Sequence, residues 1–182
     1  MASWDLPQET ARMPSLLPHR KRRAAVEPEP PTRDVWKASR FISADPPDVL
    51  ASLTDPELIG LWAPIDFEFD GLRGRRLRPG SHAYVNGSLA GVAAEFEVDV
   101  LRADEEGFDL EARGPVAFDV AYRIAPDDDG VVVDAEIKLG RERGLNARVL
   151  RAATSALLSG GALDRALGKL AGELDEAALL AA

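Results

Sequence analysis

Cysteine is absent from the sequence, which excludes disulfides, thiolate metal sites and a cysteine nucleophile. Histidine is scarce: His19 lies near the N-terminus, and His82 is the only histidine in the rest of the chain. A zinc or haem site therefore has little support, because both need histidine or cysteine ligands. We expect the protein to use neither a metal nor a cofactor.

Long apolar runs are also missing. No run approaches the roughly 18 residues that a transmembrane helix needs. The basic cluster His-Arg-Lys-Arg-Arg at 19–23 precedes no apolar segment of the kind found in secretory signals. We therefore expect a cytoplasmic protein without integral membrane association. The cluster itself is either part of a solvated tail or a small basic anchor.

Negative charge is concentrated in the middle of the chain. Residues 35–140 carry ten Lys/Arg against twenty-one Asp/Glu, whereas the segments on either side are close to neutral. Such an acidic body repels phosphate backbones, so we expect no nucleic-acid partner.

The N-terminal segment 1–34 differs in composition from the rest. It holds six of the thirteen prolines and shows no sustained periodicity. A segment of this kind buries too little apolar surface to fold alone, so we predict a disordered, proline-rich tail over 1–34. The remaining residues, 35–182, are long enough for one domain with a substantial core.

After this tail, apolar and polar residues alternate with a period of two. The pattern predicts strands with one apolar and one polar face, as in an antiparallel sheet covered on one side. In the segment 92–101, for example, Ala94, Phe96 and Val98 alternate with acidic residues. Short turns such as Asp127-Asp128-Asp129-Gly130 separate the segments. Strands are expected over 35–42, 65–70, 81–89, 92–101, 108–112, 116–124 and 131–139.

Helices are predicted in two places. Two short ones, over 48–53 and 56–62, have prolines suited to their first turns. The segment 145–174 changes to steps of three and four residues, which is typical of an amphipathic helix covering the apolar face of the sheet. Gly160-Gly161 interrupts that helix, so we expect a kink or a break there. The expected apolar positions are Leu145, Val149, Ala152/Ala153, Ala156/Leu157, Leu163, Leu167, Leu170 and Leu174.

One stretch resembles a known family. Residues 43–57, Ser-Ala-Asp-Pro-Pro-Asp-Val-Leu-Ala-Ser-Leu-Thr-Asp-Pro-Glu, are followed by Trp62. This is similar to the pattern that introduces the START-like superfamily, which contains the polyketide cyclase/dehydrase and lipid-transport families (the SRPBCC group). Arg78-Pro79-Gly80-Ser81 and Gly114-Pro115 support the resemblance, which covers about residues 35–178. It implies an α+β helix-grip fold: a curved antiparallel sheet of about seven strands, two short helices after the first strand, and a long C-terminal helix over the sheet.

The resemblance also implies a cavity between sheet and C-terminal helix that holds a small apolar or amphipathic molecule, such as a lipid, polyketide or aromatic compound. Small inward residues such as Ala94, Ala112 and Ala135 either leave such a void or let the helix sit closer, because interiors normally pack tightly. The candidate ligand-binding residues are Trp62, Tyr84, Phe96, Phe108, Phe118, Tyr122 and Leu157.

Acid–base chemistry has few candidates. His82, Tyr84 and Asn86 share one side of their strand, because side chains alternate along a strand. Directed inward, they form a polar cluster fit to orient a carbonyl or hydroxyl; directed outward, they leave Ala83 and Val85 as the core residues. Tyr122 is a further candidate, since its hydroxyl needs a partner if it is buried. Catalytic residues are not assigned, and His82, Tyr84 and Tyr122 are the ones to test.

Three functions follow from this interpretation. The first is binding of a small apolar metabolite without turnover. The second is a polyketide cyclase- or dehydratase-like enzyme. The third is a protein-interaction role similar to that of chaperone-activator homologues, with the acidic face of the sheet as the interface. The sequence predicts neither the ligand nor the oligomeric state.

Overall fold

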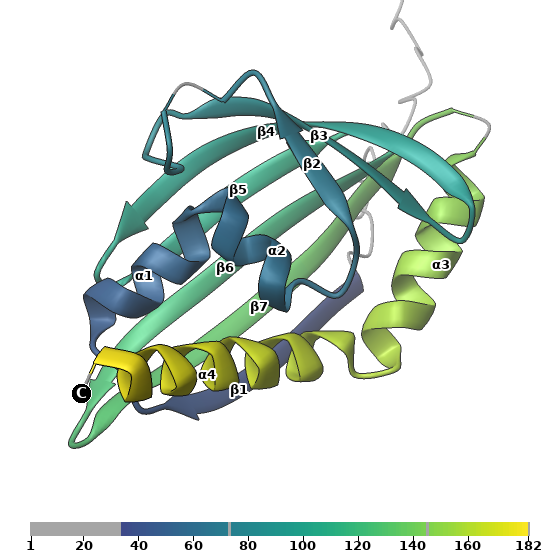
Figure 1. Ribbon diagram of the computed structural model, residues 1–182. Coiled ribbons are helices and arrows are strands. Elements are labelled where there is room, and N and C mark those ends of the chain that lie inside the picture. Colours follow the sequence, from purple (N-terminus) through teal and green to yellow (C-terminus); the bar gives the residue numbers. More distant parts are fainter. Residues whose placement is uncertain (1–33, 73, 145, 182) are drawn as a thin grey trace, which may run out of the picture. The chain divides into compact units, whose positions relative to one another are not determined.

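The computed structural model describes residues 34–72, 74–144 and 146–181. The predicted disorder of the N-terminal segment falls outside these ranges, apart from Asp34, and stays a prediction. The described residues form one antiparallel sheet and four helices (Figure 1).

The sheet has seven strands in the order β1-β7-β6-β5-β4-β3-β2, and every neighbouring pair is antiparallel. Strands β2 to β7 therefore form a meander, and β1 is added at one edge of the sheet by pairing with β7. This is the sheet that the two-residue alternation predicts. The strands are β1 (Asp34–Ile42), β2 (Phe67–Asp70), β3 (His82–Leu89), β4 (Val92–Asp104), β5 (Gly107–Arg113), β6 (Val116–Asp127) and β7 (Gly130–Glu142).

Two short helices, α1 (Pro46–Thr54) and α2 (Pro56–Trp62), follow β1, and each begins at a proline. Proline suits the first helical turn because the amide that it lacks has no partner there. The Asp55 carboxylate caps α2 by accepting a hydrogen bond from the Glu57 amide at 3.1 Å. The predicted pair of short helices is thus confirmed.

The C-terminal helix is divided as the glycines predict. Helix α3 (Ala147–Ser159) ends at Gly160, and α4 (Ala162–Ala181) begins after Gly161. Gly161 adopts a φ of 79°, a conformation that residues with a side chain rarely take. Neither helix, nor any other in the described part of the chain, is long and apolar enough to cross a membrane.

The main core lies between the inner face of the sheet and helices α1, α2 and α4, which cover that face in Figure 1. Leu167 and Leu170 of α4 are fully buried there against strand residues such as Val131 and Val133. The apolar positions predicted for 163–174 are therefore correct.

In the first part of the helix, the predicted apolar face is wrong at Val149, while the predicted Leu145 lies outside the described residues. Val149 is 52% exposed, whereas Leu150, Thr154 and Leu158 are buried. The sequence does not show this because Ala152, Ala153 and Ala156 are too small to define one apolar face of the helix. In addition, threonine is a polar residue and is not expected on the apolar face. The helix is rotated so that Thr154 faces inward.

Candidate functional site

An apolar pocket of about 230 Å³ lies between α3 and the inner face of the sheet. Strands β2 to β7 all contribute to its wall, together with Pro64 and Ile65 from the segment that joins α2 to β2. It sits at the α3 end of the sheet, beside the main core under α4. This position agrees with the expected cavity between sheet and C-terminal helix.

Small residues open this space. Gly87 of β3 lies directly opposite Ala94 of β4, so two neighbouring wall positions lack bulk. Phe96 and Phe118 extend from β4 and β6 and meet edge to face, with ring centroids 5.3 Å apart. The small pair and the large pair together leave a hollow that the aromatic rings border. Of the three small inward residues, Ala94 and Ala112 line this hollow, whereas Ala135 lies in the main core.

Helix α3 closes the pocket with one face. Leu150, Thr154, Leu157 and Leu158 follow the spacing of residues that share a side of a helix. All the described lining side chains except those of Thr154 and Ser88 are apolar. Ser88 is exposed and lies in the outward register of β3, which leaves Thr154 as the polar side chain on the inner wall.

Three of the seven predicted ligand-binding residues, Phe96, Phe118 and Leu157, line the pocket. Trp62, Phe108 and Tyr122 do not: they pack together in the main core. The Trp62 ring meets Tyr122 edge to face at 6.1 Å, and Phe108 stacks on Tyr122 at 6.5 Å. The Trp62 indole donates to the Ser52 carbonyl oxygen at 3.2 Å. Burial raises the pKa of Tyr122, which disfavours a phenolate there.

His82 and Tyr84 lie on the outer face of the sheet, away from the pocket, and so does Asn86. Their side chains are exposed while Ala83 between them is buried. The His82 Nδ1 atom lies 2.9 Å from a carboxylate oxygen of Asp99. The hydrogen bond from His82, followed by one from Arg113, lowers the pKa of Asp99. Of the two directions that the sequence leaves open for His82, Tyr84 and Asn86, the structure has the outward one.

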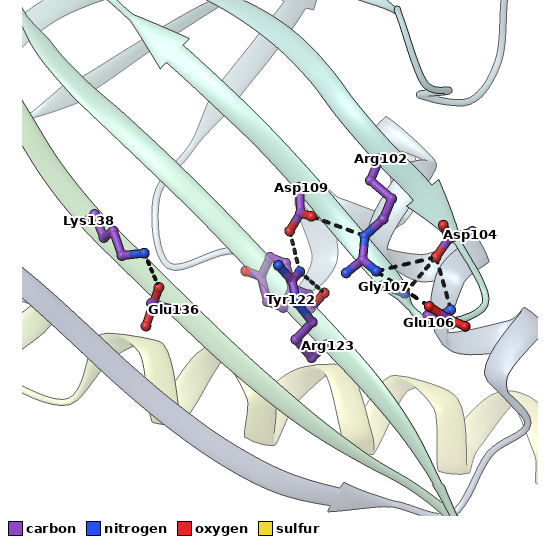
Figure 2. A network of polar contacts seen from close by, with 9 residues as sticks. All are labelled: Arg102, Asp104, Glu106, Gly107, Asp109, Tyr122, Arg123, Glu136 and Lys138. Carbon is purple, nitrogen blue, oxygen red and sulfur yellow. Dashed lines mark hydrogen bonds and ion pairs between the residues drawn. The ribbon is translucent and has the colours of Figure 1, made fainter.

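Ion pairs tie neighbouring strands together on this outer face. Arg102 of β4 donates to Asp109 of β5 at 3.0 Å, and Arg123 of β6 binds the other oxygen of the same carboxylate (Figure 2). Gly107 is needed beside them: a Cβ there would lie 2.1 Å from the Tyr122 carbonyl oxygen and 2.5 Å from an Arg102 nitrogen. The acidic face is therefore partly neutralised by its own arginines.

A second ion-pair group gives a testable pH dependence. Glu136 lies 2.5 Å from Lys138, seen in Figure 2, and 2.7 Å from Lys37. The hydrogen bonds from Lys138 and then Lys37 lower the pKa of Glu136 from 4.5 to about 2. Because the folded carboxyl binds its proton more weakly than the unfolded one, its contribution to stability is present above 4.5 and disappears as the pH falls towards 2.

We therefore expect the Glu136→Gln variant to be less stable than wild type at neutral pH. The difference should shrink as the pH is lowered from about 5 to about 2.5, because the wild type loses the contribution that the variant never had. Urea unfolding midpoints across this range measure it. Glu95→Gln, at an exposed carboxylate on β4, is the control; the same pH profile for both variants would contradict the assignment.

Comparisons with known proteins identify the fold. The structure is similar to that of a START superfamily protein from Mycobacterium smegmatis, with 14% identity, a TM-score of 0.57, and coverage of 78% of this chain and 97% of that one. It is also similar to Ara h 8.0201 (14% identity, TM-score 0.51, 76% and 98% coverage) and to protein CV1439 from Chromobacterium violaceum (17%, 0.57, 78% and 97%).

These similarities confirm the START-like helix-grip fold that the stretch at 43–57 predicts. No protein-family model matches the sequence, and no curated protein does. At identities this low the likeness establishes the fold, and folds of this kind carry different functions.

Proposed function

We propose that the protein binds a small apolar molecule in the pocket between α3 and the sheet. The observation that carries the proposal is the hollow itself: about 230 Å³ with an almost wholly apolar wall, which is typical of sites for small molecules. Burying an apolar ligand against such a wall is favourable by about 25 cal/mol for each Å² removed from water.

The volume limits the ligand. A cavity of about 150 Å³ holds one benzene molecule, so 230 Å³ corresponds to a ligand of about nine non-hydrogen atoms. Drug-sized ligands need about 300 Å³ or more. Of the classes expected from the resemblance, a small aromatic compound fits the pocket as it stands, whereas a sterol or a polycyclic polyketide exceeds it.

Binding without turnover is favoured over catalysis. The described side chains that line the pocket include no histidine, carboxylate, lysine, arginine or tyrosine, so they offer no general acid or base to a bound molecule. His82 and Tyr84 face outward, and Tyr122 lies in the main core. The polyketide cyclase-like function would need an acid or base from outside this wall.

Thermal unfolding tests the proposal. A ligand that binds only the folded state raises its stability by about 2.7 kcal/mol at 100 times the Kd, which is roughly 5–10 °C in Tm for a domain of this size. We expect acetophenone, an aromatic ketone of nine non-hydrogen atoms, to raise Tm in a saturable manner, and cholesterol to leave it unchanged. No shift with any small aromatic compound up to its solubility limit would contradict the proposal.

A further inference from the structure

Thr154 is the polar exception in the inner wall of the pocket. It lies in the middle of α3, its residue is 7% exposed, and it lines the hollow together with Leu150, Leu157 and Leu158 from the same helix. The strand side chains across from it, such as Val120, are apolar. Thr154 therefore adds a polar group to an otherwise apolar part of the pocket wall.

The hydroxyl of Thr154 has no hydrogen-bond partner among the described residues. A threonine inside a helix can donate to the carbonyl three or four residues earlier. Thr54 of α1 does so, with its hydroxyl 2.7 Å from the Leu50 carbonyl oxygen. No equivalent bond joins Thr154 to the Leu150 carbonyl, although both threonines are buried. The Thr54 hydroxyl is therefore bonded within its own helix, whereas the Thr154 hydroxyl at the pocket is available to a ligand.

When a wholly apolar ligand fills the pocket and displaces water, a hydroxyl left without a hydrogen bond costs about 1–3 kcal/mol in proteins. A bound molecule with an oxygen at this point supplies the missing partner. The described wall offers no cation to pair with a buried carboxylate or phosphate, and an unpaired buried charge is far more costly than a neutral group.

We propose that Thr154 selects the ligand of this pocket: a neutral, compact, mainly aromatic or alicyclic molecule that carries one carbonyl or hydroxyl group. The oxygen hydrogen-bonds the Thr154 hydroxyl on the helix side, and the apolar body packs against Phe96, Phe118 and the strand side chains. This assignment rests on the proposed function and narrows it from apolar molecules in general to small ketones and alcohols.

A matched pair of probes tests the assignment. Acetophenone and α-methylstyrene have the same shape and number of non-hydrogen atoms, but only the ketone accepts a hydrogen bond. The affinity of both is measured by calorimetry for wild type, Thr154→Val and Thr154→Ser. Valine keeps the shape of threonine and removes the hydroxyl, whereas serine keeps the hydroxyl.

We expect Thr154→Val to weaken acetophenone binding by roughly three- to tenfold, the range of one neutral hydrogen bond. Its α-methylstyrene affinity should stay equal or rise, and Thr154→Ser should keep the preference for the ketone. The Tm of ligand-free Thr154→Val should stay within a few degrees of that of wild type, because valine keeps the shape of threonine and the Thr154 hydroxyl has no hydrogen bond to the described residues.

The outcomes separate the two proposals. If both probes bind wild type and Thr154→Val weakens them equally or not at all, the role of Thr154 is refuted while the pocket remains a binding site. A Tm of ligand-free Thr154→Val that falls by more than a few degrees would also refute it, since that result means that the hydroxyl already has a partner within the protein. If neither probe binds wild type, both proposals fail.

Discussion

The Ala94→Phe variant is expected to lose acetophenone binding, with an affinity at least about 100-fold below that of wild type. Ala94 faces the pocket opposite Gly87 and two residues before Phe96. A phenyl ring at this position adds the bulk of a benzene molecule, for which a cavity of about 150 Å³ is enough, to a hollow of about 230 Å³. Too little space for a nine-atom ligand remains, and the fold is kept because the ring occupies space that is already empty.

Ala93→Phe is the matched control. It makes the same substitution on the same strand one residue earlier, where the side chain is exposed on the outer face of the sheet. Calorimetric titration with acetophenone should give wild-type affinity for Ala93→Phe and no measurable heat of binding for Ala94→Phe. Equal affinities for the two variants would mean that the ligand binds elsewhere on the protein.

The Leu167→Ala variant is expected to lower the free energy of unfolding by about 3–5 kcal/mol. Leu167 is fully buried where α4 packs on the sheet, and its truncation removes apolar contacts and leaves a cavity. In urea, with a slope near 2 kcal/mol/M, the midpoint should fall by about 2 M.

Leu180→Ala serves as the control for this variant, because Leu180 lies on the same helix and is 91% exposed. It should change the free energy of unfolding by less than about 0.5 kcal/mol. Both variants are measured by urea unfolding followed with circular dichroism. Similar losses for both would contradict the packing of α4 against the inner face of the sheet.

Most of the fold follows from the sequence because its local signals agree with the final structure. Two-residue alternation identifies most of the strands, the prolines mark the starts of α1 and α2, and Gly160-Gly161 marks the break between α3 and α4. Strands β4, β6 and β7 each continue three residues beyond their predicted ends. Strand β4 does so through an irregularity between Val100 and Arg102 that leaves Leu101 58% exposed.

The pocket was predictable only in part. Alternation places Phe96, Phe108, Phe118 and Tyr122 on the inner face, but it does not tell which end of that face lies under α4 and which under α3. Phe108 and Tyr122 lie in the main core under α4, whereas Phe96 and Phe118 line the pocket under α3. That division depends on how α1, α2 and α4 fill the sheet, which is a property of the tertiary structure.

Thr154 was missed for a related reason. Its neighbours Ala152, Ala153 and Ala156 give the helix no strong face, so a one-residue rotation was invisible in the sequence. The direction of His82 and Tyr84 was likewise open, because Ala83 and Val85 are small enough to suit either face. The structure resolves both cases through the burial of single residues.

The most direct test of the central claim is an NMR measurement of contacts between acetophenone and the methyl groups of the protein. Binding in the pocket predicts intermolecular nuclear Overhauser effects from the phenyl ring to Val120, Ile137 and Leu150, which line it on the strand and helix sides. Outer-face methyls such as those of Leu101 and Val35 should show none. Contacts confined to the outer face, or no contacts at saturating ligand, would contradict the account.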